Sequence, residues 1–285
     1  MFHDAHNHLQ DDWLAPHLDR IASAWSGGVM VVNGTCEADW SRVAELARRY
    51  PWIRPSYGLH PWDAGNRTAD WFATLKAYLD ADPRAGVGEI GIDRWMLDRA
   101  RPDDARLTGL RRAPLPEQGE VFLKQLALAC SENRPVTIHC LEAWGALSEI
   151  LARVNLPERG FLLHAYGGPP ELVAHFAKLG AYFSFNGYFL KDLAPSPKAA
   201  SPASTRLKAF QQVPLERLLV ETDAPAMPLP QTWRTHKLPP APDGSPVNHP
   251  GNLEAAYAGL AMLRSLPLAE LTAQVEINFL RFFGP

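Results

Sequence analysis

The 285-residue sequence contains little cysteine and no excess of positive charge. Its three cysteines, Cys36, Cys130 and Cys140, are far apart and form no CxxC motif, which is typical of thiols in a reducing compartment rather than of a disulfide framework. Lys and Arg number 28 against 31 Asp and Glu, so the formal net charge is −3. Such a chain has no overall attraction to nucleic acid, and binding a polyanion would need a local basic patch or bound cations.

Long hydrophobic runs and an apolar leader are also missing. The sequence has no run of about 18 consecutive apolar residues, the length needed to span a bilayer. Met1 leads directly into Phe2 and His3, without the basic and apolar regions of a signal peptide. We therefore expect no membrane association, a cytoplasmic location and no obligate protein partner. With 46% hydrophobic and 21% charged residues, the composition excludes a disordered chain.

Short apolar runs alternate with amphipathic helical patterns along the whole chain. Runs such as 29–32 and 161–163 are continuously apolar, which is typical of strands buried on both faces. The predicted strands are 2–6, 29–34, 53–58, 86–91, 135–139, 161–165, 181–186 and 217–222. The predicted helices include 39–50, 69–81, 117–133, 142–154, 169–179 and 203–212. This alternation predicts an α/β protein, a single-domain (β/α)8 TIM barrel over residues 1–285. A doubly wound open sheet is the alternative on pattern alone.

Three of the predicted connections that follow strands are extended, at about 94–116, 187–204 and 224–250. Eight of the 26 prolines lie in the last of them. The first contains six arginines, which fit either a solvated charged loop or a basic lip for substrate. In barrels of this kind the loops after the strands build the active site.

Six side chains with nitrogen or oxygen donors lie at or near predicted strand ends: His6, His8, Glu89, His139, His164 and Asp223. The carboxyl ends of barrel strands share one face, and two strand residues two positions apart point to the same side. Imidazole and carboxylate together favour Zn²⁺, Mn²⁺, Fe or Ni over Ca²⁺. A catalytic zinc usually has three protein ligands and a water. Six donors therefore predict two ions about 3.5–4 Å apart, bridged by a carboxylate.

The sequence predicts the six donors as a set but leaves alternatives for the roles of single residues. A lone histidine at a strand end is more often a hydrogen-bonded structural residue than a ligand. His60, in the Gly58–Pro61 turn, either orients substrate or the ligands or has a structural role. Asp223 is the candidate general base, because a carboxylate beside a metal-activated water accepts its proton.

Several short motifs follow one another in a recognisable order. They are Asp4-Ala5-His6-Asn7-His8-Leu9, Gly58-Leu59-His60-Pro61, Gly86-Val87-Gly88-Glu89-Ile90-Gly91-Ile92-Asp93, Val136-Thr137-Ile138-His139, Leu162-Leu163-His164 and Leu219-Val220-Glu221-Thr222-Asp223-Ala224-Pro225. Together they resemble the TatD family of metal-dependent hydrolases, a branch of the amidohydrolase superfamily. The resemblance runs from residue 2 to about residue 285.

The resemblance implies a TIM barrel with one or two divalent ions, Zn, Mn or Mg. It implies one ion held by His6, His8, Glu89 and Asp223. It implies a second ion held by Glu89, His139 and His164, with Glu89 bridging. It also implies hydrolysis, most often of phosphodiester bonds in DNA, with exonuclease activity in several members. Nucleic acid or a small phosphodiester is therefore the expected substrate.

The sequence departs from the family pattern around the expected substrate wall. Leu141 stands where the family often has an arginine, and His164-Ala165-Tyr166 replaces a His-Cys-Phe motif. Arg94 and the arginines after it are candidates for the missing phosphate contacts. A hydrolase of small esters, amides or lactones on the same metal centre is thus an alternative, and a non-catalytic metal-binding barrel is a second one. Glu89 takes the place of the carbamylated lysine of many binuclear amidohydrolases, which favours the TatD side.

Overall fold

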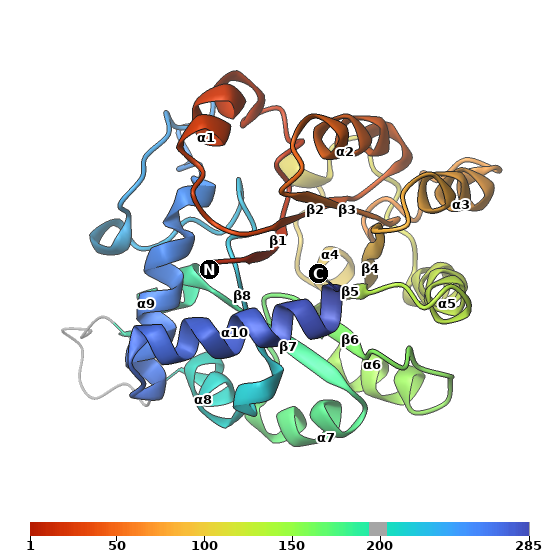
Figure 1. Cartoon of the computed structure of the whole chain (residues 1–285). Coiled ribbons are helices and arrows are strands. Elements are labelled where there is room, and N and C mark those ends of the chain that lie inside the picture. Colours follow the sequence, from red (N-terminus) through yellow and green to blue (C-terminus); the bar gives the residue numbers. More distant parts are fainter. Residues whose placement is uncertain (194–203, 285) are drawn as a thin grey trace. The chain divides into compact units, whose positions relative to one another are not determined.

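A computed structural model describes residues 1–193 and 204–284 (Figure 1). Within these residues, eight strands form one sheet in the order β1 to β8, with helices between them. The strand pairs with a defined register are all parallel. A doubly wound sheet reverses its strand order at a switch point, so sequential order excludes that alternative. The fold is the predicted (β/α)8 barrel.

The observed elements agree with the predicted ones to within a few residues. The strands are β1 (Asp4–Asn7), β2 (Met30–Gly34), β3 (Ile53–Tyr57), β4 (Gly86–Asp93), β5 (Val136–Leu141), β6 (Phe161–Leu163), β7 (Ala181–Asn186) and β8 (Leu218–Glu221). The helices are α1 (Leu18–Ala24), α2 (Glu37–Arg49), α3 (Trp71–Ala81), α4 (Trp95–Asp98), α5 (Leu115–Ser131), α6 (Trp144–Leu151), α7 (Val173–Lys178), α8 (Thr205–Gln212), α9 (Leu253–Arg264) and α10 (Leu268–Phe283). Of these, α1, α4, α9 and α10 were not among the predicted helices.

By internal contacts the chain divides into two compact units. The first comprises Met1–Val32, Ala165–Lys178 and the described part of Tyr182–Pro285. The second comprises Asn33–His164 and Leu179–Ala181. The expected single domain with three extended loops stays a prediction, and residues 194–203 of the second loop lie outside the described part of the chain.

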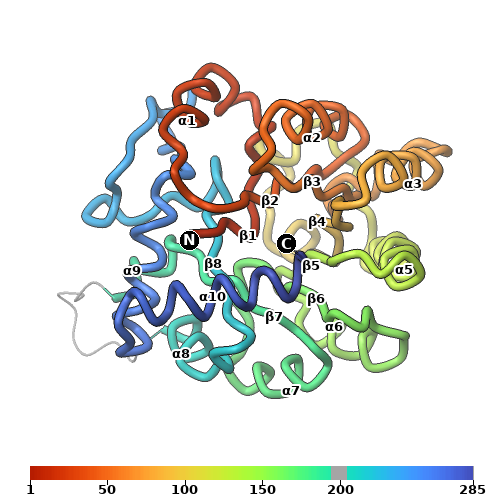
Figure 2. Tube along the Cα trace, in the orientation of Figure 1, coloured from red at the N-terminus to blue at the C-terminus, as the bar shows by residue number. Residues whose placement is uncertain are grey.

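In the first unit, β1 and β8 lie side by side (Figure 2). The N–H of Asp223 donates to the carbonyl of His6 over 2.9 Å, and the N–H of His8 donates to the carbonyl of Ala224 over 2.8 Å. Helix α10 packs against α9 and β8 and buries Phe279 among other apolar side chains. Burying one phenylalanine contributes about 1.5–3 kcal/mol. This packing holds the carboxyl ends of β1 and β8 in register.

In the second unit, β4 lies between β3 and β5, and α5 packs against it. Gly91 of β4 has φ +148°, and a Cβ at this position would lie 1.9 Å from the carbonyl oxygen of His139. Glycine therefore permits β4 and β5 to approach at this level.

Two buried glutamines of α5 hold the loops that follow β3 and β4. The amide of Gln125 accepts from Leu59 N–H over 2.7 Å and donates to Leu59 carbonyl over 3.1 Å. Gln118 makes the same pair of bonds with the backbone of Asp93, over 2.7 and 3.1 Å. Helix α5 thus fixes the backbone next to His60 and at Asp93.

No helix among residues 1–193 and 204–284 is long and apolar enough to cross a bilayer.

Candidate metal centre

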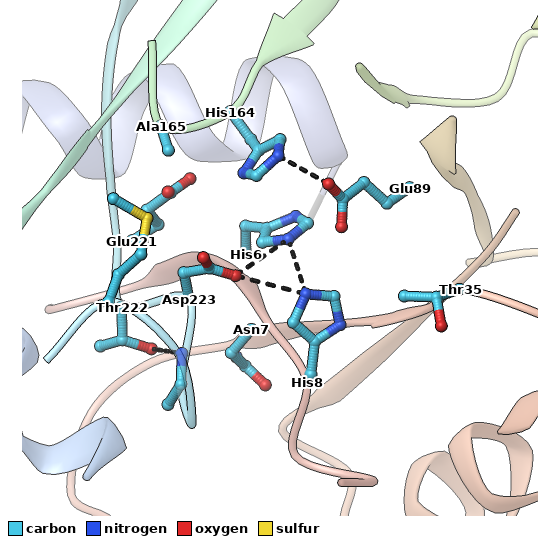
Figure 3. Close-up of polar contacts among 12 residues, drawn as sticks. His6, Asn7, His8, Thr35, Glu89, His164, Ala165, Glu221, Thr222 and Asp223 are labelled. Carbon is cyan, nitrogen blue, oxygen red and sulfur yellow. Dashed lines mark hydrogen bonds and ion pairs between the residues drawn. The ribbon is translucent and has the colours of Figure 1, made fainter. Parts of the chain in front are cut away.

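Three predicted ligands of the first unit converge (Figure 3). The Nε2 atoms of His6 and His8 lie 3.2 Å apart. Asp223 Oδ1 lies 3.5 Å from His6 Nε2 and 3.3 Å from His8 Nε2. The side chain of His6 is fully buried, and those of His8 and Asp223 are largely buried. Two nitrogens and one carboxylate oxygen therefore point at a common centre.

A buried aspartate positions these three residues. Asp4 of β1 accepts from His6 N–H and from both the N–H and the hydroxyl of Thr222. Asp223 follows at φ +53°, a left-handed conformation that costs a non-glycine residue about 1–3 kcal/mol. The strain directs the Asp223 carboxylate to the two histidines. Burial raises the pKa of Asp4 to about 7, against the opposing effect of the Thr222 hydrogen bonds.

Three histidines converge on Glu89 in the second unit. Glu89 Oε1 lies 2.7 Å from His139 Nδ1, 2.7 Å from His164 Nε2 and 3.3 Å from His60 Nε2. His139 Nδ1 and His164 Nε2 are 3.2 Å apart. Figure 3 shows the His164–Glu89 contact. The strand ends of β5 and β6 thus bring their two histidines to the carboxylate of β4.

Asp93 orients the far side of the His139 ring. Its Oδ2 lies 3.2 Å from His139 Nε2, and the carboxylate is fully buried. Burial would raise the pKa of Asp93, but the hydrogen bonds and charge of its neighbours, His139 first, hold it below its ordinary value. Burial would likewise lower the pKa of His139, but its bonds to Asp93 and Glu89 raise it to about 9. Asp93 is therefore an ionised acceptor for the Nε2–H of His139, which directs Nδ1 to Glu89.

His60 belongs to this cluster, and its hydrogen bonds set the tautomer of its ring. Its Nδ1 accepts from the backbone N–H of Trp62 over 3.1 Å, so the proton of the neutral ring is on Nε2. Burial lowers the pKa of His60, which keeps the ring neutral. The Nε2–H then faces Glu89 and donates to it, which leaves no lone pair for an ion.

Both clusters have the donor types that a divalent ion binds; the spacing of an ion's ligands is approached by His6, His8 and Asp223, while Glu89 lies at hydrogen-bond distance from His139 and His164. Donor atoms about 2.1 Å from a shared ion lie roughly 3.0–3.4 Å from one another. The distances among His6, His8 and Asp223 are 3.2–3.5 Å, and those among Glu89, His139 and His164 are 2.7–3.2 Å. Imidazole nitrogen with carboxylate oxygen suits Zn²⁺ and Mn²⁺. The residues fit a metal.

Two further residues lie close to the end of β4: Arg94, a predicted phosphate contact, and Asp93, for which no role was predicted. Arg94 lies at the start of α4 with about half of its side chain exposed, 3.6 Å from Asp98, and its role toward phosphate stays a prediction. Asp93 was not predicted to take part, although it stands four positions after Glu89 on one strand. That spacing puts both carboxylates on the same face of β4, and this signal was available in the sequence.

A family model described as TatD related DNase matches residues 3–284. The chain belongs to the TatD family. YabD of Bacillus subtilis, described as an uncharacterized metal-dependent hydrolase, is 26% identical over 99% of both chains. The 3'-5' ssDNA/RNA exonuclease TatD of Escherichia coli K12 is 27% identical, over 93% of this chain and 92% of that protein.

A solved structure supports the same assignment. The TatD homologue YjjV of Escherichia coli K12 superposes with a TM-score of 0.79 at 25% identity and covers 100% of this chain and 98% of its own. Family membership over almost the whole chain, together with the two donor clusters, makes the protein a metal-dependent hydrolase of the TatD type. The resemblance drawn from its motifs is confirmed.

Proposed function

We propose that this enzyme hydrolyses phosphodiester bonds of nucleic acid at two divalent cations, Zn²⁺, Mn²⁺ or Mg²⁺. The observation that carries the proposal is the pair of clusters of imidazole and carboxylate donors. A TatD relative named as an ssDNA/RNA exonuclease supports the choice of substrate. A cytoplasmic location fits such an enzyme and stays a prediction.

The fold supports the proposed set of ligands. Carboxyl ends of parallel barrel strands share one face, so residues ending β1, β4, β5, β6 and β8 are suited to one binuclear centre. His6, His8 and Asp223 would hold one ion. His139 and His164 would hold the other. Glu89, with its carboxylate facing two histidines in its own cluster, is the proposed bridge.

In the proposed reaction, Asp223, His60 and Arg94 have separate roles. When bound, the ions supply a nucleophilic water at neutral pH and a Lewis acid for the phosphoryl oxygens. Asp223 takes up the proton of the attacking water at its carboxylate, as a general base. His60 donates through Nε2–H to Glu89 and so holds that carboxylate in place. Arg94 would contact a substrate phosphate from its half-exposed position after β4.

Leu141 favours a second candidate function. This side chain at the end of β5 is 36% exposed and apolar, at the position where the family often has arginine. An apolar wall suits small esters, amides or lactones better than a phosphate backbone. These substrates would use the same metal centre.

The test compares both substrate classes on one metal-defined sample. Protein stripped with EDTA is reconstituted with Zn²⁺, Mn²⁺ or Mg²⁺ and assayed on 5'-labelled single-stranded DNA, RNA, a chromogenic phosphodiester and a lactone. We expect no activity after chelation and metal-dependent shortening of the labelled strand from its 3' end. Hydrolysis of the lactone alone would replace the nuclease assignment with the second candidate, and activity that survives chelation would contradict both.

A further inference from the structure

Trp62 contacts two residues at the cluster around Glu89: His60, which belongs to the cluster, and Asp93, which contacts His139. Its ring Nε1–H donates to Asp93 Oδ2 over 2.6 Å, and its backbone N–H donates to His60 Nδ1 over 3.1 Å. The ring also meets the His60 imidazole edge-on, with centroids 5.5 Å apart. Trp62 is therefore the residue in the loop after β3 that reaches both the His60 and the His139 side of the cluster.

The two carboxylate oxygens of Asp93 face three donors. Its Oδ1 accepts from Met96 N–H over 3.0 Å, while Oδ2 receives the Trp62 ring N–H and faces His139 Nε2. The carboxylate is fully buried, so water does not replace a missing donor. The tilt of the carboxylate, and with it the direction of the His139 ring, thus depends on the indole.

Side chains of the segment that follows β4 pack against the Trp62 ring. It stacks on Trp95 with a centroid distance of 5.9 Å, and the guanidinium of Arg106 covers the Trp95 ring at 4.4 Å. Both tryptophans pack against the buried cluster of Met96, Ala100 and Leu107. A half-buried indole with this support has one orientation, and its N–H is preorganised toward Asp93.

We propose that Trp62 is a positioning residue of the metal centre. Its ring N–H fixes the Asp93 carboxylate, Asp93 accepts the Nε2–H of His139, and Nδ1 of His139 is left facing Glu89, where it would bind the ion. The residues around Trp95 serve to hold this indole. The inference rests on the proposed ligand role of His139 and not on the identity of the substrate.

The test is the affinity for metal of Trp62→Phe, which keeps an aromatic ring against Trp95 and removes the N–H. Apo protein is titrated with Zn²⁺ in competition with a chromophoric chelator. Outer hydrogen bonds to a ligating histidine are worth about 10–100-fold in metal affinity. We expect one of two binding steps to weaken about tenfold, with the other step unchanged. Unchanged affinity in both steps would overturn the proposal.

Two further measurements separate positioning from a general structural effect. Trp95→Phe keeps an aromatic ring against the Trp62 indole and leaves the indole N–H in place, so we expect both zinc affinities to remain as in the wild type. The thermal midpoint of each apo variant reports on folding. Equal losses of zinc affinity in Trp95→Phe and Trp62→Phe would show that packing alone matters and would contradict the proposal.

Asp93→Asn tests the pathway through Asp93 directly, because the single variant leaves Trp62 unchanged. Because Trp62 acts through Asp93, the double variant Trp62→Phe/Asp93→Asn should bind zinc no more weakly than Asp93→Asn alone. If Asp93→Asn binds zinc normally, or if the two losses multiply, the pathway through Asp93 is wrong. Activity enters none of these readouts, so failure of the nuclease assignment would leave them interpretable.

Discussion

Asp4 and Thr222, 218 positions apart in the sequence, are joined by two hydrogen bonds between the ends of β1 and β8. Asp4 Oδ1 accepts the Thr222 N–H over 3.0 Å, and Oδ2 accepts its hydroxyl over 2.5 Å. Each residue lies two positions or fewer from a proposed metal ligand, His6 or Asp223. The geometry of the first donor cluster is therefore set by a contact that contains none of its ligands.

Thr222→Val should destabilise the protein by about 1–3 kcal/mol, because the buried Asp4 carboxylate loses its hydroxyl donor. Denaturant unfolding measures the loss. Thr272→Val is the matched control, since that hydroxyl bonds only the helical carbonyl of Leu268 on an exposed stretch of α10. A Thr222→Val loss no larger than that of the control would show that the buried contact contributes little.

Asp223→Asn should retain most of the bound metal and lose hydrolysis by about 100-fold or more. The amide keeps an oxygen that faces His6 and His8. Asparagine also tolerates the left-handed backbone at φ +53°. It does not accept a proton at neutral pH. Metal analysis and turnover on the same sample give the two quantities, and near-normal turnover would exclude Asp223 as the base.

Glu89→Gln should lower metal content and activity together. The carboxylate lies within 3.3 Å of a nitrogen of each of His60, His139 and His164, and a neutral amide removes the charge that offsets bound cations. Metal per chain is measured by elemental analysis after dialysis. A variant with unchanged metal content and turnover would rule out the bridging role.

The hydrogen bonds of Glu117 with Arg111 and Arg67 lower its pKa from 4.5 to about 2. Because the pKa of the folded state lies below that of the unfolded state, the stabilisation is complete above pH 4.5 and is lost as the pH falls toward 2. Glu117→Gln should therefore have a lower thermal midpoint than the wild type at pH 7, with the difference shrinking below pH 4.5.

The control for this prediction is Glu120→Gln, an exposed position on the same helix. Its midpoint should follow that of the wild type at every pH. A difference between Glu117→Gln and the wild type that stays constant down to pH 2 would place the effect outside the ionisation of this carboxylate.

The sequence predicts the strands and the donor residues because both follow from local pattern. Continuous apolar runs such as Phe161–Leu163 are buried strands, and the side chains of His6 and His8 must leave β1 on the same side. The family motifs extend this to Glu89 and Asp223. Local pattern and the family resemblance together therefore predict the fold class and the residues of both donor clusters.

The supporting contacts could not be predicted, because they join residues distant in sequence. Gln118 and Gln125 are polar residues in an otherwise ordinary amphipathic helix, and only packing against β4 shows that they bond Asp93 and Leu59. In the sequence, nothing distinguishes Trp62 from other tryptophans in turns. Its role depends on the hydrogen bond from its ring N–H to Asp93, which only the structure shows. Helix α10 was missed because its apolar face finds its partners only in the folded unit.

The residues after β4 have buried and exposed side chains with different contacts. Met96, Ala100 and Leu107 form a small buried core. Their inward side chains carry the tryptophan stack, while Arg99 and Arg101 project into solvent. Substitutions at Arg99 and Arg101 can therefore change the charge of the solvent-facing surface while the packing of Trp62 and Trp95 on the small core stays as it is.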